Sequence, residues 1–82
     1  MKNRYYVYIL NSLKDITKSY IGFTGDINRR LQEHNSGNQT YTKRYSPWEL
    51  ETCITFSDKE KAQEFELYLK GGSGKAFIKN HF

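Results

Sequence analysis

With 82 residues, the chain has room for one small domain, residues 1–82, and not for a catalytic domain beside a separate regulatory one. Its net charge of +4 and its pI near 9.2 favour a polyanionic partner, although many small basic proteins bind no nucleic acid. No apolar run is long enough for a signal peptide or a membrane span, so we expect a soluble, cytoplasmic protein with no membrane partner.

The predicted elements begin with two strands joined as a hairpin. Residues 5–10, YYVYIL, combine aromatic and β-branched side chains, and residues 19–23, SYIGF, resume a strand after the polar segment 11–18. Asp26 can cap a helix over roughly residues 27–35, which the sequence NSGN then ends. The first part of the chain therefore predicts a β-hairpin followed by a helix.

The middle of the chain predicts a loop and then a third strand. Residues 36–46 are polar and partly basic, which is typical of a loop. After Pro47, the sequence WELETCITF alternates roughly between apolar and polar residues, as a strand does. The single cysteine, Cys53, falls within this strand, so we expect a buried or half-buried thiol without a chemical role.

Two helices are predicted to complete the domain. The sequence SDKE places Glu60 three residues after Ser57, which forms a capping box and opens a helix that ends near Leu69. The sequence KGGSG then breaks that helix, and Ser73 can cap a short last helix over KAFIKN. The order ββαβαα predicts an α/β (α+β) sandwich in which helices flank one three-stranded sheet.

Both longer helices carry ionisable residues on the face that should cover the core. On the first helix, this face contains Ile27, Arg30, Leu31 and His34. Burying an unpaired charge is costly, so such groups need partners or a wet cleft. The corresponding face of the second helix contains Ala62, Phe65, Glu66 and Leu69. Three explanations are open: Glu66 pairs with Arg30 in a structural salt bridge, both side chains reach outward to solvent, or the ionisable groups form a functional site.

The hairpin brings a second group of polar side chains together. Alternation places Tyr6 and Tyr8 on one face of the first strand, and Tyr20, Gly22 and Thr24 on one face of the second. These faces could meet, with Gly22 leaving room for a ligand or for close approach of the backbone. Tyrosine is also common in strands, and ordinary packing is the simpler explanation of this group.

Several common catalytic motifs are absent from the sequence. It has no glycine-rich phosphate loop with a lysine, no paired cysteines or HExxH sequence for zinc, and no serine nucleophile elbow. Glu66 alone of the nine acidic residues falls on an apolar stripe, which argues against a two-metal cluster held by several carboxylates.

Taken in order, the two strands of the hairpin resemble the motifs of the GIY-YIG nuclease family. The segment Tyr6-Val7-Tyr8 resembles the first motif, with Tyr8 at the place of its tyrosine and Tyr6 in place of its glycine. The segment Tyr20-Ile21-Gly22 matches the second motif in every letter.

The helices extend this resemblance over essentially the whole chain. Arg30, ten residues beyond Tyr20, falls on the family arginine, and His34 falls on the histidine one turn later. Glu66 falls on the family glutamate, and the segments RRLQEHNSG and EFELYLKGGSGKAFIK look like those of the small stand-alone members. These members are related to the nuclease domain of the excision-repair incision enzymes (excinucleases). The resemblance implies cleavage of phosphodiester bonds, with DNA favoured, in repair, recombination or mobile elements.

The resemblance also implies a role for each matching residue. Glu66 would be the sole protein ligand of one Mg²⁺ or Mn²⁺ ion, and Arg30 would neutralise charge on the scissile phosphate. Tyr8 would be the general base, with Tyr20 orienting the water or replacing Tyr8 as the base. A tyrosine has a pKa of about 10, which a nearby metal and arginine would lower. His34 would accept a proton from Tyr8, bind a phosphate oxygen, or only hold the helix against the sheet.

The chain departs from the family directly after the second motif. Some repair relatives have a lysine there, whereas this chain has Phe23, and Lys43 is either a substitute or a solvated loop lysine. Family members often place an asparagine near the site, for which Asn80 is the candidate in the last helix. Lys43, Arg44 and Tyr41 could follow a nucleic-acid backbone and stack bases, or could form a surface turn.

Three functions are compatible with these observations. The first is a metal-dependent endonuclease. The second is a non-catalytic nucleic-acid-binding module with the same fold, because 82 residues leave little beyond the catalytic core to recognise a substrate. The third is a nuclease that cuts only when a protein partner supplies its substrate specificity.

Overall fold

The sheet of the domain is a three-stranded antiparallel one with the order β2-β1-β3. The structure is a computed structural model that describes residues 4–36 and 40–81. The predicted hairpin pairs Tyr8 with Gly22, and on the other side of β1 the register places Tyr8 opposite Cys53. The strands are β1 (Tyr5–Ser12), β2 (Ser19–Thr24) and β3 (Trp48–Phe56).

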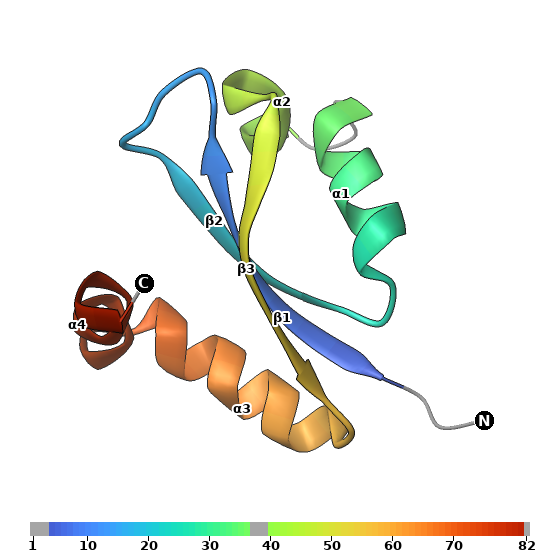
Figure 1. Cartoon of the computed structure of the whole chain (residues 1–82), viewed down its shortest axis with the longest axis vertical. Coiled ribbons are helices and arrows are strands. Elements are labelled where there is room, and N and C mark those ends of the chain that lie inside the picture. Colours follow the sequence, from blue (N-terminus) through green and yellow to red (C-terminus); the bar gives the residue numbers. More distant parts are fainter. Residues whose placement is uncertain (1–3, 37–39, 82) are drawn as a thin grey trace.

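Helices cover both faces of this sheet, as Figure 1 shows. Helices α1 and α2 lie on one face, and α3 and α4 lie on the other. The predicted α/β sandwich is thus confirmed, and β2 forms an edge strand between the two helical layers. In the described part of the chain, no helix is long and apolar enough to cross a membrane. The helices are α1 (Ile27–Ser36), α2 (Thr40–Tyr45), α3 (Lys59–Lys70) and α4 (Gly72–His81).

Each face of the sheet has its own apolar core. The face covered by α3 and α4 is built on Val7 and Ile9, because alternate residues of a strand point to opposite faces. The other face is built on Tyr8, Leu10 and Trp48, over which α1 packs its predicted apolar residues. The residues that close the first core from the helices are Ala62, Phe65, Leu69, Phe77 and Ile78.

The segment predicted as a loop over residues 36–46 contains a further helix, α2, so the order is ββααβαα. Its polar sequence gives little helical signal, and tertiary contacts decide the outcome. The indole Nε1 of Trp48 donates to the carbonyl of Thr42 at 2.7 Å, and the ring of Tyr41 stacks on the indole. Asn35 at the end of α1 also accepts from the backbone N–H of Trp48 at 2.6 Å. Residues 37–39 lie outside the described part of the chain.

The helix ends differ from the predicted caps in the second half of the chain. Asp26 caps α1 as predicted, accepting from the N–H of Arg29. The prediction of a capping box at Ser57 is wrong, because Asp58 is the N-cap of α3 and accepts from the N–H groups of the next turn. The prediction that Ser73 caps the last helix is also wrong, since α4 already begins at Gly72.

The expectation of a buried or half-buried thiol at Cys53 is wrong as well, because this residue is exposed. Cys53 lies opposite Tyr8 and therefore on the face of the sheet that α1 covers. The apolar side chains of α1 pack over Tyr8, Leu10 and Trp48, and Cys53 stays uncovered.

Gly74 lets the start of α4 pack directly against the end of α3. It is buried, and a Cβ atom there would collide with the carbonyl oxygen of Tyr68 and the backbone of Leu69. Backbone atoms cannot move aside cheaply, so we expect Gly74→Ala to lower the free energy of unfolding by about 3 kcal/mol. Gly72→Ala is the matched control, because a Cβ at Gly72 meets nothing within 4 Å. Urea denaturation of both variants would measure the difference, and equal stabilities would contradict the packing described.

Candidate active site

A buried pair of side chains, Tyr8 of β1 and His34 of α1, joins the sheet to the first helix. Tyr8 Oη and His34 Nε2 form a hydrogen bond at 2.9 Å. Tyr8 is 2% exposed and His34 is fully buried, so only a small part of Tyr8 can be reached from solvent. Among the described residues, no partner is found for the buried Nδ1 of His34. His34 thus occupies the core-facing stripe because it has a polar partner on the sheet.

Gly22 permits this arrangement by having no side chain. It lies opposite Tyr8 in the hairpin register, and a Cβ atom there would overlap the phenol of Tyr8. The ring of Tyr8 therefore lies close against the backbone of β2, with its hydroxyl aimed at His34. The absent side chain makes room for this ring, whereas the sequence predicted room for a ligand or for close approach of the backbone.

Tyr20 adds a third ring to the pair. Its ring centroid lies 4.7 Å from that of His34 and 6.3 Å from that of Tyr8. Unlike Tyr8, Tyr20 is only partly buried, so it forms the solvent-facing side of the group. The two tyrosines of the hairpin and the histidine of α1 thus form one contiguous cluster.

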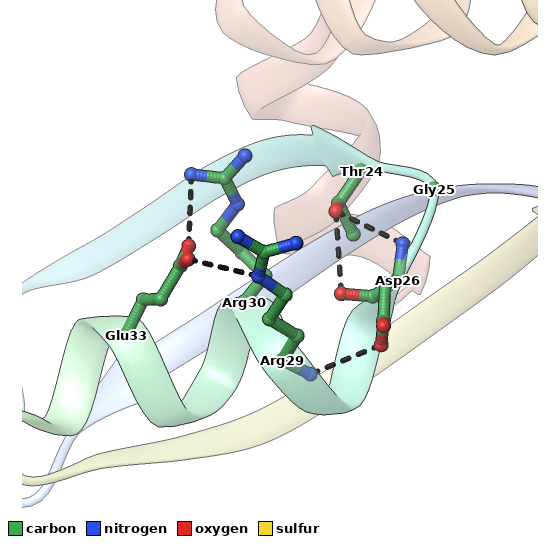
Figure 2. A pocket seen from close by; sticks show the side chains of 6 residues that line it. All are labelled: Thr24, Gly25, Asp26, Arg29, Arg30 and Glu33. Atoms are coloured by element: carbon green, nitrogen blue, oxygen red, sulfur yellow. Dashed lines mark hydrogen bonds and ion pairs between the residues drawn. The ribbon is translucent and has the colours of Figure 1, made fainter.

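Arg30 lies one turn before His34 on α1, beside a surface cavity of about 360 Å³. Figure 2 shows the guanidinium groups of Arg29 and Arg30 converging on the carboxylate of Glu33. Arg30 Nη1 lies 3.3 Å from Glu33 Oε1, and Arg29 Nε lies 3.3 Å from Glu33 Oε2. Arg30 is therefore held in place while about a third of its side chain, 36%, stays exposed.

Glu66 comes from the opposite helical layer, on α3. Its Oε2 accepts from the ammonium group of Lys70, one turn later, at 3.1 Å. The carboxylate side chain is 18% exposed, so this ion pair is open to solvent on one side. Glu66 therefore pairs with Lys70, and Arg30 with Glu33, instead of the direct salt bridge between Glu66 and Arg30 that the sequence left open.

The ionisable groups act on Tyr8 and His34 through their charges. Burial raises the pKa of Tyr8 well above its usual value, and Tyr20 raises it further. Arg30 lowers this pKa, whereas Glu66 and Glu33 raise it, which places all three within electrostatic reach of the phenol. Burial and then Arg30 lower the pKa of His34, so its imidazole is neutral at pH 7.

The donor set is compatible with only one kind of metal site. Within residues 4–36 and 40–81, no three His, Cys, Asp or Glu side chains gather closely enough to hold an ion. A single carboxylate, that of Glu66, fits a hard divalent cation that keeps most of its ligands as water or phosphate oxygens. It does not fit zinc, which needs several nitrogen or sulfur ligands.

The other predicted residues lie on α2 and α4, and the ring of Tyr41 is in contact with Tyr20 of the cluster. Lys43 and Arg44 are exposed on α2, and the carbonyl of Arg44 accepts from the ammonium group of Lys14. Tyr41, also on α2, is 45% exposed and lies 6.2 Å from Tyr20, ring to ring. Asn80 is exposed on α4.

The structure adds two residues that the sequence analysis missed. Glu33 positions Arg30, and Lys70 positions Glu66. Both lie three or four residues from their partners on the same helix, which is the spacing at which oppositely charged side chains meet. A search for this spacing around Arg30 and Glu66 would have found them.

Comparisons with known proteins show the family to which the chain belongs. A family model described as the GIY-YIG catalytic domain matches residues 4–80. The chain therefore belongs to the GIY-YIG family.

Several relatives carry the name UPF0213. The chain is 39% identical to the UPF0213 protein YsiG of Lactococcus lactis over 69 residues, which are 83% of this chain and 64% of that protein. A solution NMR structure of a UPF0213 protein from Bacillus halodurans matches with a TM-score of 0.57 and 31% identity, covering 94% of this chain and 83% of that one. The chain thus spans about two thirds of the length of the first of these relatives.

A second group of relatives has names that state an activity. The structure-specific endonuclease subunit slx1 of Talaromyces marneffei is 38% identical over 68 residues, which are 76% of this chain and 18% of that protein. The match therefore concerns a small part of a much longer protein.

Proposed function

We propose that this protein is a metal-dependent endonuclease that hydrolyses phosphodiester bonds in nucleic acid, with DNA the favoured substrate. The observation that carries the proposal is the buried hydrogen bond between Tyr8 and His34, with Arg30 one turn before His34 on the same helix. Glu66, from the opposite helical layer, acts on the phenol through its charge. Membership of the GIY-YIG family and the named activity of the slx1 relative support it.

Glu66 would hold one Mg²⁺ or Mn²⁺ ion at the solvent-facing side of the site. Such an ion, when bound, supplies positive charge to a phosphate oxygen and to the leaving oxygen. The carboxylate must first release the ammonium group of Lys70, which now occupies one of its two oxygens. Because the pair is partly exposed, water can replace the lysine at modest cost.

Arg30 would bind the scissile phosphate. Its guanidinium presents several donors in a plane, which suits two oxygens of a phosphate and the extra charge that develops on them. Glu33 holds the guanidinium at the mouth of the cavity, and Arg29 on the other side of Glu33 offsets the charge of that carboxylate. The group is therefore in position before the substrate arrives.

The Tyr8–His34 pair would remove the proton from the attacking water. As the water oxygen bonds to phosphorus, its proton passes to Tyr8 Oη while the phenolic proton passes to His34 Nε2. The bond between phosphorus and the leaving oxygen breaks, and that oxygen takes a proton from solvent. This relay never forms a free phenolate, which burial strongly disfavours at Tyr8. It uses the neutral imidazole with its proton on Nδ1.

Tyr20 is the alternative base, because it is partly exposed whereas Tyr8 is buried. In the relay, Tyr20 instead orients the water at the entrance to the pair. Tyr20→Phe would distinguish these roles, because loss of a group that orients the water should lower the cleavage rate less than loss of the base.

The activity is tested with purified protein and labelled branched, nicked and plain duplex DNA in Mn²⁺ or Mg²⁺. We expect cleavage of at least the branched or nicked substrate, abolished by EDTA. Salt-dependent binding without cleavage of any substrate would support the non-catalytic binding module instead. Cleavage that appears only when a protein partner is added would support the partner-dependent nuclease.

Arg30→Ala should reduce the cleavage rate by about 10²- to 10³-fold, the usual loss when a group that stabilises transition-state charge is removed. Arg30→Lys keeps the charge but not the planar pair of donors and should recover only part of the rate. Arg29→Ala is the matched control, since it also removes a cation from Glu33. Equal rates for Arg29→Ala and Arg30→Ala in single-turnover assays would contradict the assigned role.

A further inference from the structure

A second surface depression lies beside the proposed site, at the start of β2. This groove has a volume of about 390 Å³ and draws its walls from β2, α2, α3 and α4. We call it the lysine groove, and its defining residues are Lys18, Tyr20, Tyr41, Lys70 and Lys75. Of these residues, the proposed chemistry involves Tyr20 and, through its ion pair with Glu66, Lys70.

The charge of the lysine groove is strongly positive. Three ammonium groups line it, and no carboxylate is among its lining residues. Within the described part of the chain, Lys75 forms no ion pair, and Lys18 has only the nearby Asp15, whose pKa it lowers. The Lys18 ammonium lies 5.5 Å from the ring centroid of Tyr45, a residue of α2, so its only other contact is with an uncharged ring. The ammonium groups of Lys18 and Lys75 are therefore available to an anionic ligand, whereas that of Lys70 is paired with Glu66.

The groove also presents an aromatic ring in a fixed position. Tyr41 stacks on Trp48 at a centroid distance of 6.1 Å, and its hydroxyl donates to the carbonyl of Ser19. The residue is nevertheless 45% exposed, and it lines the groove, so a ligand in the groove can contact it. Fixed aromatic rings beside lysines are the features that bind single strands, because bases stack on the rings while phosphates contact the cations.

The groove leads directly into the catalytic cluster. The ring of Tyr41 lies 6.2 Å from that of Tyr20, and the ring of Tyr20 lies 4.7 Å from that of His34. Lys70 joins the two regions, since its ammonium group binds Glu66 while its side chain lines the groove. A strand that enters the groove would therefore pass next to Tyr20 and the Tyr8–His34 pair.

We propose that the lysine groove binds a single-stranded segment of the nucleic-acid substrate next to the bond to be cut. The phosphates contact Lys18 and Lys75, and one base stacks on Tyr41. This proposal deepens the proposed function, because it gives the substrate an unpaired strand beside the scissile bond. Binding itself needs neither metal nor cleavage, so it can be tested separately.

The test measures binding of fluorescein-labelled oligo(dT) of about 20 nucleotides, and of a duplex of equal length, in EDTA. We expect the double variant Lys18→Ala/Lys75→Ala to weaken oligo(dT) binding roughly tenfold and to reduce the salt slope by about 1.4, from two lost phosphate contacts. The matched control is Lys59→Ala/Lys61→Ala, which removes equal charge from exposed positions at the other end of α3. Equal losses in both double variants would overturn the proposal.

Stacking is tested with Tyr41→Ala and Tyr41→Phe. We expect Tyr41→Ala to weaken oligo(dT) binding roughly tenfold and duplex binding much less, while Tyr41→Phe retains most of the affinity. If Tyr41→Ala does not fold, the lysine variants decide the matter. Equal competition by polyglutamate and oligo(dT) would show a general anion surface and overturn the proposal. If the groove variants weaken oligo(dT) binding but no substrate is cleaved, the proposed function is contradicted and the binding role of the groove is not. If a substrate is cleaved and neither groove variant changes cleavage, the role of the groove is contradicted and the proposed function is not.

Discussion

Glu66→Gln should reduce metal-dependent cleavage by about 10³-fold, which makes it one of the most damaging single changes in the protein. Glutamine keeps the shape of the side chain but loses the negative charge that attracts a hard cation. The side chain is partly exposed on α3, so the fold should tolerate the change. Single-turnover cleavage at saturating Mn²⁺ measures the rate, and Mn²⁺ electron paramagnetic resonance measures ion binding without reference to activity.

Glu64→Gln is the matched control for this prediction. Glu64 lies on the same helix as Glu66 but is exposed and two residues away, which turns it to another side of α3. We expect Mn²⁺ binding and cleavage to be unchanged in this variant. Lys70→Met should strengthen Mn²⁺ binding, because it frees the second carboxylate oxygen of Glu66. If Glu66→Gln bound Mn²⁺ as well as the original protein does, the metal would have to be held elsewhere.

The sheet and the helices α1 and α3 could be predicted because local patterns specify them. Alternation in the hairpin, the cap at Asp26 and the apolar stripe of α1 each agree with the tertiary structure. Helix α2 could not be predicted, since its formation depends on Trp48, whose indole donates to Thr42 from outside the segment. Sequence patterns within residues 36–46 contain no trace of that contact.

The members of the site could be proposed from spacing, but their arrangement could not. The sequence placed Arg30 and Glu66 on apolar stripes and left open a direct salt bridge between them. The two helices lie on opposite faces of the sheet, so these side chains are held by separate partners, Glu33 and Lys70, and do not pair with each other.

The burial of Tyr8 also changes how its chemistry is understood. The resemblance to the family implied a phenolate base whose pKa a metal and Arg30 would lower. In the fold, burial raises the pKa of Tyr8, and the opposing effect of Arg30 does not cancel it. In the proposed relay, the neutral His34 at 2.9 Å accepts the phenolic proton, so no free phenolate has to form.

The pH dependence of cleavage separates the relay from a phenolate base. In the relay, the rate requires neutral His34, whose pKa lies below the usual value of about 6.5 because of burial and Arg30. The single-turnover rate should therefore be nearly constant from about pH 7 to 9 and fall only at acidic pH, below the usual histidine pKa. A phenolate base would instead give a rate that rises about tenfold per pH unit over this whole range, since the pKa of Tyr8 lies above about 10.

Variants of the pair complete this prediction. Tyr8→Phe should reduce the rate by about 10²- to 10⁴-fold, and His34→Gln, which keeps a hydrogen-bonding group next to Tyr8, should reduce it comparably. Protonation of His34 favours the unfolded state because its pKa is lowered in the fold, so stability falls as the pH drops below about 6.5. Thermal unfolding at each pH therefore separates loss of fold from loss of catalysis. A steadily rising rate between pH 7 and 9 that Tyr8→Phe abolishes and His34→Gln leaves intact would assign the base to Tyr8 alone.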